Sequence, residues 1–185
     1  LTILSVVESY DGLLVIDEAF IDTRPENSLS IIKSDSLIIL RSLGKFFGLP
    51  GIRIGFVIAN KQWRDAIESA LGPWAVSGPS QWIATQCLKD IAWQRHATKS
   101  LQALSKQQLA FLSESFTSIS RNIGSSDYFN TLCLSKKTAE EMHSYFAQHG
   151  ILIRKIDLDG ESLLRFGLCA DEASLSLFQQ VASSY

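Results

Sequence analysis

The sequence predicts an α/β fold in which a mostly parallel sheet with helices is followed by a small α+β domain. Two short apolar runs bounded by turn residues, Leu13–Ile16 and Ser36–Leu40, are typical of buried parallel strands. From Tyr128 onward, short strands alternate with helices in a second, smaller pattern. We therefore expect the C-terminal part of a large domain in residues 1–93 and a small C-terminal domain in residues 94–185.

The composition is that of a folded protein with a sizeable core, because 46% of the 185 residues are apolar and 19% are charged. A net charge of −2 without any Lys- or Arg-rich run argues against a nucleic-acid or membrane-surface partner. No apolar run approaches the roughly 20 residues that span a bilayer. The three cysteines form no CxxC pair, and the three histidines share no metal-ligand spacing. We expect a cytoplasmic protein without disulfides or metal.

The first domain begins with what resembles the end of a helix, Leu1–Tyr10, closed by the turn Asp11-Gly12. No signal-peptide pattern follows Leu1, and we interpret the chain as the C-terminal part of a longer enzyme. After the two buried strands, periodicity and turn residues predict a strand at Arg53–Ile58 and helices at Lys61–Leu71 and Ser80–Trp93.

The small domain is expected to follow a long helix. The predicted elements are a helix at Ala97–Ile119, a strand at Tyr128–Leu134, a helix at Thr138–His149, strands at Ile151–Arg154 and Leu163–Leu168, and a last helix at Asp171–Ser183 capped by Asp171.

A single lysine, Lys45, stands in the Gly-rich loop that follows the second strand. Ser42 precedes it by three positions and Arg53 follows it by eight. Because the flanking strands are apolar, we expect the ammonium to be partly desolvated, which disfavours its charged form. A neutral amine is the nucleophile that condenses with a carbonyl. A lone lysine in such a loop is more often a solvated turn residue, so the combination with Ser42 and Arg53 is what indicates a site.

The segment Ser42–Phe56, with Lys45, Arg53 and the glycines between them, resembles the signature of pyridoxal-phosphate enzymes of the aspartate aminotransferase fold type. In that family the lysine carries the cofactor covalently, while the flanking hydroxyl and the arginine hold its phosphate. The resemblance implies pyridoxal 5'-phosphate as cofactor, Lys45 as a catalytic residue, and Ser42 and Arg53 as cofactor-binding residues. It also implies a homodimer with the active site at the subunit interface.

Asp17 directly follows the first strand, at the edge of an open α/β sheet where ligands bind. A carboxylate there can pair with a protonated ring nitrogen and keep the ring an electron sink, although a turn cap is the commoner role. The resemblance makes Asp17 a catalytic and cofactor-binding residue. It places Phe20 where the family usually carries a tyrosine that contacts the cofactor. Phe20 cannot donate that hydrogen bond, and simple packing is its alternative role.

The stretch Leu71–Pro79 is irregular but too apolar for an ordinary surface loop. In the family the equivalent stretch lies at the dimer interface and reaches toward the neighbour's cofactor phosphate, which makes Ser77 a candidate dimer contact. An equally open alternative is that Ser77 is the N-terminal hydroxyl of the next helix.

Two arginines of the small domain are candidates for substrate binding. Arg165 is embedded in an apolar strand, and its fixed donors match a carboxylate or a phosphate. The family binds the substrate carboxylate with an arginine closely followed by a glycine, which matches Arg165 and Gly167. Arg154 resembles a second arginine used by members with phosphorylated substrates. A surface salt bridge is the alternative for each.

Three segments resemble the sequences of cobalamin-pathway threonine-phosphate decarboxylases more than those of histidinol-phosphate aminotransferases: Leu40–Leu49, Leu71–Gly78 and Leu164–Leu168. Histidinol-phosphate aminotransferases tend to carry Ser at the position of Gly44 and Tyr at that of Phe20. This resemblance implies a carbon–carbon lyase that decarboxylates a small phosphorylated amino acid, L-threonine O-3-phosphate, to (R)-1-aminopropan-2-yl phosphate in cobalamin biosynthesis. A histidinol-phosphate transaminase is the alternative.

A third interpretation is a catalytically inactive binding remnant. Family members carry a Gly-rich phosphate loop and an aromatic residue that stacks on the cofactor ring, both ahead of the part of the family pattern matched here. We therefore expect the isolated 185 residues to turn over no substrate.

Overall fold

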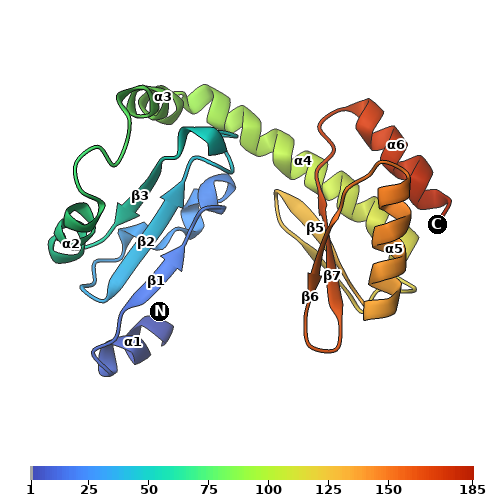
Figure 1. The fold of residues 1–185 in the computed structure, drawn as a ribbon, viewed down its shortest axis with the longest axis horizontal. Coiled ribbons are helices and arrows are strands. Elements are labelled where there is room, and N and C mark those ends of the chain that lie inside the picture. The colour runs from blue at the N-terminus through green and yellow to red at the C-terminus, as the bar shows by residue number, and fades with distance from the viewer. Residues whose placement is uncertain (1) are drawn as a thin grey trace. The chain divides into compact units, whose positions relative to one another are not determined.

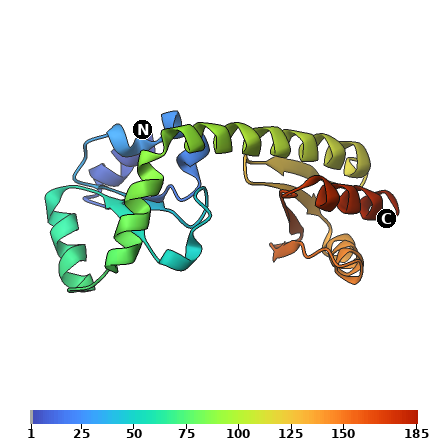
Figure 2. The same cartoon turned by 90° about the horizontal axis from the view of Figure 1, so that it is seen from above.

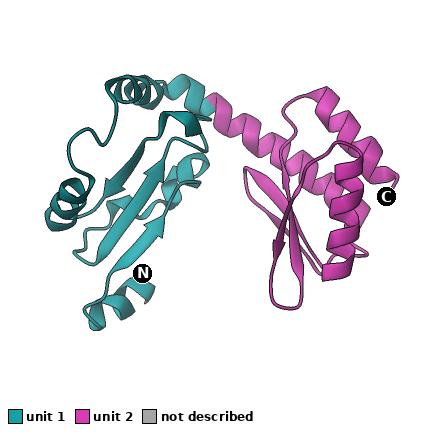
Figure 3. Ribbon diagram, viewed as in Figure 1, with its two compact units in different colours: residues 1–95 teal, residues 96–185 magenta. Residues whose placement is uncertain are grey.

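The computed structural model describes residues 2–185. The chain forms two compact units, residues 1–95 and residues 96–185, which are drawn in two colours in Figure 3. Each unit is described by itself below.

The first unit contains a three-stranded sheet in the order β1-β2-β3 (Figure 1). Strands β1 (Leu14–Asp17) and β2 (Leu37–Ser42) are parallel, and β3 (Gly55–Ile58) runs antiparallel to β2. Helix α1 (Thr2–Ser9) contributes Leu4 to a buried cluster with Leu37 and Ile39 of β2. Because β1 and β2 are parallel, Asp17 and Ser42 lie at the same edge of the sheet.

The connection from β1 to β2 is built from three short 3-10 helices, η1 (Ile21–Thr23), η2 (Pro25–Asn27) and η3 (Leu29–Ile31). Its anchor is the buried carboxylate of Glu18, which accepts hydrogen bonds from the Ser28 hydroxyl and the Leu29 amide, both at 2.7 Å. Arg41 of β2 pairs with Asp22 at 2.6 Å and approaches Glu18 at 3.6 Å. These charge-assisted contacts hold the connection against the end of the sheet.

Three helices follow β3: α2 (Lys61–Leu71), α3 (Gly78–Lys89) and α4 (Ile91–Phe116). The prediction of one helix at 80–93 and a second from 97 is wrong, because the break lies at Asp90. The Asp90 carboxylate accepts a hydrogen bond from the Trp93 amide at 3.0 Å, and this cap starts α4 immediately after α3 ends.

The second unit is an antiparallel sheet in the order β4-β5-β7-β6. Its strands are β4 (Asn122–Ser125), β5 (Phe129–Leu134), β6 (Arg154–Asp157) and β7 (Ser162–Gly167), and its further helices are α5 (Lys136–Gln148) and α6 (Glu172–Ser183). Helices α4, α5 and α6 contribute to one buried cluster with alternate residues of β5 and β7, including Leu132, Leu164 and Phe166. Figures 1 and 2 show α5 and α6 side by side. Residues that alternate with this cluster, such as Arg165, lie on the opposite face of the sheet.

Two details of this sheet differ from the prediction. Strand β4 was not expected, since its sequence has no alternating pattern. An added Cβ at Gly124 would lie 2.6 Å from Thr131 Oγ1, so a larger residue there would require the Thr131 side chain to move. The strand expected at 151–154 instead begins at Arg154. Ile153 belongs to the buried core before β6 starts, so the apolar run reflects core packing and not strand pairing.

Candidate active site

The loop between β2 and β3 is anchored by aromatic packing. Phe46 and Phe47 are buried, and their rings lie 5.4 and 5.7 Å from the ring of Trp93. At the start of the loop the Ser42 hydroxyl accepts a hydrogen bond from the Gly44 amide at 3.0 Å. An added Cβ at Gly44 would lie 3.3 Å from that hydroxyl oxygen, so the turn favours glycine. The loop thus holds Lys45 at a defined place beyond the end of β2.

The side chain of Lys45 is exposed, so the expectation that it is desolvated between two strands is wrong in this structure. Gly48 and Gly51 of the same loop have no side chains to cover the amine, and an added Cβ at either position would have no atom within 4 Å. Its ammonium lies over the ring of Phe20, 5.3 Å from the centroid. This contact is a cation–π interaction, through which Phe20 helps to place the amine. The sequence analysis had considered only the missing tyrosine hydroxyl and simple packing for Phe20.

Arg53 has a left-handed backbone conformation, with φ 52° and ψ 50°. It ends the 3-10 helix η4 (Pro50–Ile52), and β3 begins two residues later, so the expectation that Arg53 opens the strand is wrong. Only glycine adopts this conformation without cost. An arginine held there is a strained residue of the kind that occurs at binding sites. Its Nη1 donates to the Pro50 carbonyl at 3.4 Å, and the rest of the side chain is exposed.

A cavity of about 300 Å³ gathers three of the predicted site residues, Ser42, Lys45 and Arg53. Gly44 and Gly55 line it as well, and a Cβ at Gly55 would lie 2.9 Å from the Arg41 carbonyl. The described residues that line the cavity supply two cationic side chains and no carboxylate. Such a cavity suits an anionic ligand with an electrophilic centre within reach of an amine.

Asp17 ends β1 as expected, but it is not among the residues that line this cavity. Its Oδ1 accepts a hydrogen bond from the Ala19 amide at 2.9 Å, which is the turn-cap contact of the alternative interpretation. The cap engages one carboxylate oxygen. The role of Asp17 toward a ring nitrogen stays a prediction.

Ser77 is the N-cap of α3, and its hydroxyl accepts a hydrogen bond from the Ser80 amide at 3.3 Å. The helix-start alternative is therefore seen directly, while the dimer contact stays a prediction. Ser80, which the sequence analysis did not single out, donates its hydroxyl proton to the Ile52 carbonyl at 2.8 Å. The only sequence signal at Ser80 was its place in the first turn of a helix, which does not indicate a contact 28 residues away.

The two candidate substrate arginines are direct neighbours in the second unit. Arg154 of β6 and Arg165 of β7 are register partners in an antiparallel pair. The guanidinium of Arg165 lies 5.0 Å from the centroid of Phe129, while Arg154 is exposed. Neither makes an ion pair recorded among the described residues. The surface-salt-bridge alternative thus has no support in the part of the chain that the structure describes.

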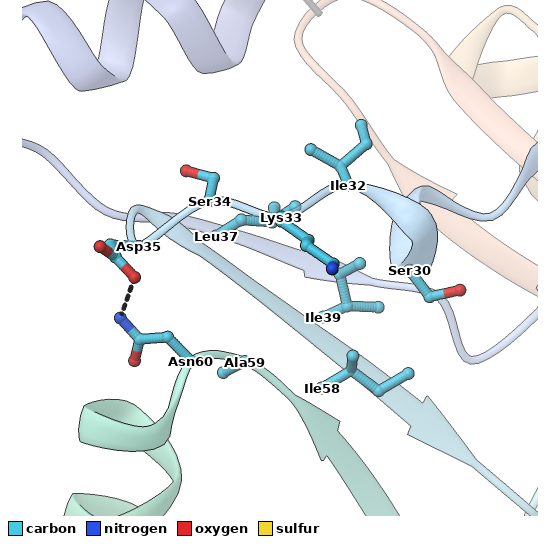
Figure 4. A pocket seen from close by; sticks show the side chains of 10 residues that line it. All are labelled: Ser30, Ile32, Lys33, Ser34, Asp35, Leu37, Ile39, Ile58, Ala59 and Asn60. Carbon is cyan, nitrogen blue, oxygen red and sulfur yellow. Dashed lines mark hydrogen bonds between the residues drawn. The ribbon is translucent and has the colours of Figure 1, made fainter.

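A larger cavity of about 510 Å³ lies elsewhere in the first unit, and Figure 4 shows the side chains that line it. Asn60 donates a hydrogen bond to Asp35 at 2.8 Å, and both residues line this cavity (Figure 4). This cavity contains none of the predicted site residues. Size alone therefore does not identify the site, and the chemistry of the lining residues does.

Across residues 2–185, no group of three or more His, Cys, Asp or Glu side chains is arranged to hold a metal ion. All three cysteines are free, and burial raises the pKa of Cys133 and Cys169, so these two thiols are poor nucleophiles. None of the helices in this range is long and apolar enough to cross a bilayer. The Cys133 and Cys169 thiols belong to the second unit, and Cys87 is the free cysteine of the first.

The sequence profile of the aminotransferase class I and II family matches residues 1–176. The chain belongs to this family. Threonine-phosphate decarboxylase of Pseudomonas aeruginosa is 38% identical over 164 residues, which are 88% of this chain and 47% of that protein. A threonine-phosphate decarboxylase of a Sinorhizobium species is 36% identical over 165 residues, again 88% of this chain and 47% of the relative.

Among solved structures, histidinol-phosphate aminotransferase of Clostridium acetobutylicum superposes with a TM-score of 0.82 at 28% identity, covering 99% of this chain and 57% of that one. The two-unit α/β fold predicted from the sequence is therefore confirmed. The chain spans about half the length of the curated relatives that it matches.

Proposed function

We propose that the protein carrying this chain is a pyridoxal-phosphate-dependent decarboxylase of L-threonine O-3-phosphate. The substrate's carboxylate leaves as CO₂ and a proton takes its place at Cα, which gives (R)-1-aminopropan-2-yl phosphate without a second substrate. The observation that carries the proposal is the cavity of Ser42, Lys45 and Arg53, in a chain 38% identical to a threonine-phosphate decarboxylase.

The residues of this cavity fit pyridoxal 5'-phosphate. Arg53 and the Ser42 hydroxyl supply donors for a phosphate, and the absence of carboxylates among the described lining residues removes a source of repulsion. The Lys45 amine is available for covalent attachment to the cofactor aldehyde. When bound, the cofactor supplies an electron sink for the electron pair that the departing CO₂ leaves.

The remaining roles belong to the side chains of this protein. Lys45 attaches the cofactor and then holds a proton at Nζ for delivery to Cα. Asp17, at the same sheet edge as Ser42, keeps the ring nitrogen protonated through its carboxylate. Phe20 holds the Lys45 side chain through the contact between its ring and the ammonium.

Arg154 and Arg165 bind the two anionic groups of threonine phosphate. Two guanidinium groups at opposed register positions present two adjacent sets of hydrogen-bond donors, which matches a substrate that carries both a carboxylate and a phosphate. The contact with Phe129 holds Arg165 in place. With the phosphate anchored by one arginine, the substrate carboxylate would be the group placed to leave as CO₂. The proposed assembly is a cytoplasmic homodimer with the active site at the subunit interface, where Ser77 contacts the neighbour.

The test is an assay of the natural protein with threonine phosphate and without any keto acid. We expect CO₂ release that disappears in Lys45→Ala. Lys61→Ala is the matched control, because Lys61 is an exposed lysine whose one recorded contact is an ion pair with Asp65 on the same helix. Equal CO₂ release by Lys45→Ala and the natural protein would contradict the proposal. The isolated 185 residues should release none.

A histidinol-phosphate transaminase is the second candidate, since the TM-score of 0.82 is to a histidinol-phosphate aminotransferase. Turnover of histidinol phosphate that requires 2-oxoglutarate, together with no CO₂ from threonine phosphate, would favour it. If cofactor added to the protein leaves its absorption unchanged, the inactive binding remnant is the better description.

A further inference from the structure

The strained backbone of Arg53 needs a restraint, because a left-handed conformation costs a residue with a Cβ free energy that relaxation would recover. The restraint must act on the peptide units on either side of Arg53. After Arg53, β3 begins at Gly55, which pairs with Ser42 of β2 and approaches the Arg41 carbonyl closely. This fixes the chain on the C-terminal side.

On the N-terminal side the restraint comes from α3. The Ser80 hydroxyl donates to the Ile52 carbonyl at 2.8 Å, and Ser80 is buried, with 8% of its surface exposed. The Ile52 carbonyl belongs to the peptide unit that joins Ile52 to Arg53. A hydrogen bond to this oxygen therefore sets the orientation of the peptide plane and, with it, the φ angle of Arg53.

The direction of the hydrogen bonds in this region follows from counting protons. A serine hydroxyl has one proton, and that of Ser80 is given to Ile52. The contact of 2.9 Å between the Ser77 and Ser80 hydroxyls must then have Ser77 as donor. The result is a chain of hydrogen bonds from Ser77 through Ser80 to the peptide that precedes Arg53. Such chains strengthen their members by polarisation.

We propose that Ser80 is a positioning residue for cofactor binding: its hydroxyl holds the Ile52–Arg53 peptide so that the Arg53 guanidinium faces the cavity, and it acts on the phosphate of the cofactor through Arg53. This inference rests on the proposed function, because it takes Arg53 as the phosphate ligand. It assigns to Ser80 a role that its place in a helix start does not suggest.

The test compares the affinity of the natural protein and its variants for two ligands, pyridoxal 5'-phosphate and pyridoxal, by titration of protein fluorescence. Pyridoxal lacks the phosphate, so the ratio of the two dissociation constants isolates the phosphate contribution. Ser80→Ala should weaken pyridoxal-phosphate binding about three- to tenfold, as expected for one neutral hydrogen bond, and leave pyridoxal binding unchanged. Arg53→Ala should weaken pyridoxal-phosphate binding by at least about tenfold, as expected for a lost charge-assisted contact.

Two further variants separate positioning from a general loss of structure. Thr85→Val removes another hydroxyl of α3, one that donates to the Gln81 carbonyl within the helix, and it should bind both ligands as the natural protein does. Ser80→Cys keeps the side-chain volume but replaces the hydroxyl by a weak donor. It should weaken pyridoxal-phosphate binding in the same selective way even if Ser80→Ala does not fold.

The outcomes distinguish a failure of the Ser80 inference from a failure of the proposed function on which it rests. If Arg53→Ala is selective and the Ser80 variants behave like Thr85→Val, the role of Ser80 is overturned and the proposed function stands. If the Ser80 variants lose both ligands by the same factor, Ser80 stabilises the fold only and the inference is overturned. If Arg53→Ala changes both ligands equally, Arg53 does not bind the phosphate, and the proposed function fails together with the inference. Selective losses in Arg53→Ala and in the Ser80 variants support it.

Discussion

The left-handed backbone of Arg53 predicts an unusual order of stability for two substitutions at this position. Arg53→Ala and Arg53→Gly both remove the guanidinium and its 3.4 Å contact with the Pro50 carbonyl. They differ in the Cβ, which is the source of the strain at φ 52°. The difference in stability between the two variants therefore contains the strain and the greater chain freedom of glycine, and nothing of the lost side-chain contact.

The expected magnitude follows from two opposing terms. A left-handed conformation costs a residue with a Cβ about 1–2 kcal/mol, which glycine does not incur. Glycine loses about 0.5–1 kcal/mol relative to alanine because its unfolded chain has more freedom. The Gly variant should thus be the more stable by about 0.5–1 kcal/mol, which corresponds to a rise in melting temperature of about 2–8 °C for a compact unit of the size of residues 1–95.

Thermal unfolding followed by circular dichroism measures this difference. The control is the pair Lys99→Ala and Lys99→Gly within α4, an exposed helical position where alanine should be the more stable by about 0.5–1 kcal/mol. The reasoning predicts a reversal of order between positions 53 and 99. If alanine is at least as stable as glycine at position 53, Arg53 is not held in the left-handed conformation, and the argument for Ser80 as its restraint is refuted as well.

Three further predictions concern other parts of the chain. Lys45→Ala should abolish the change in absorption that pyridoxal phosphate undergoes on covalent attachment to the natural protein, and an equal change in the variant would contradict the role of Lys45. Leu164→Ala should destabilise the second unit by about 2–5 kcal/mol, since Leu164 is fully buried in its core; chemical denaturation measures this, and a cost below about 1 kcal/mol would refute the described packing. The Ser174 amide donates a hydrogen bond to the Asp171 carboxylate and lowers the pKa of that carboxyl. The ionised carboxylate therefore stabilises α6 above the ordinary aspartate pKa, and this stabilisation is lost as pH falls through the lowered pKa. Helix content followed in acid should fall less steeply in Asp171→Asn, and identical acid profiles would contradict the cap.

The sequence predicted most of the architecture because its main elements carry strong local signals. The strands β1 and β2 are apolar runs between turn residues, and α2 ends at a glycine as expected. Strand β4 escaped prediction because it is stabilised by pairing with β5 and has no pattern of its own. The break at Asp90 escaped it because a capping contact, and not a change in periodicity, separates α3 from α4.

The proximity of three predicted residues was predictable from the sequence, whereas their roles stay predictions and their geometry was not predictable. The spacing of Ser42, Lys45 and Arg53 indicated that they act together, and one cavity contains all three. The exposure of Lys45 was not predictable, because local apolar sequence does not tell whether the chain folds over a side chain. The contribution of Ser80 depends on a contact between residues 28 positions apart, which no local pattern encodes.

The opposed arginines of β6 and β7 have a thermodynamic consequence. Like charges directly across a strand pair repel, so the pairing of Arg154 with Arg165 carries an electrostatic cost as long as no counter-ion lies between them. An oxyanion bound between the two arginines removes that cost, and because it binds the folded state, it stabilises the folded state by mass action. Substrate or inorganic phosphate should accordingly protect this hairpin against hydrogen exchange, which makes the edge of the second unit a reporter of occupancy that needs no turnover.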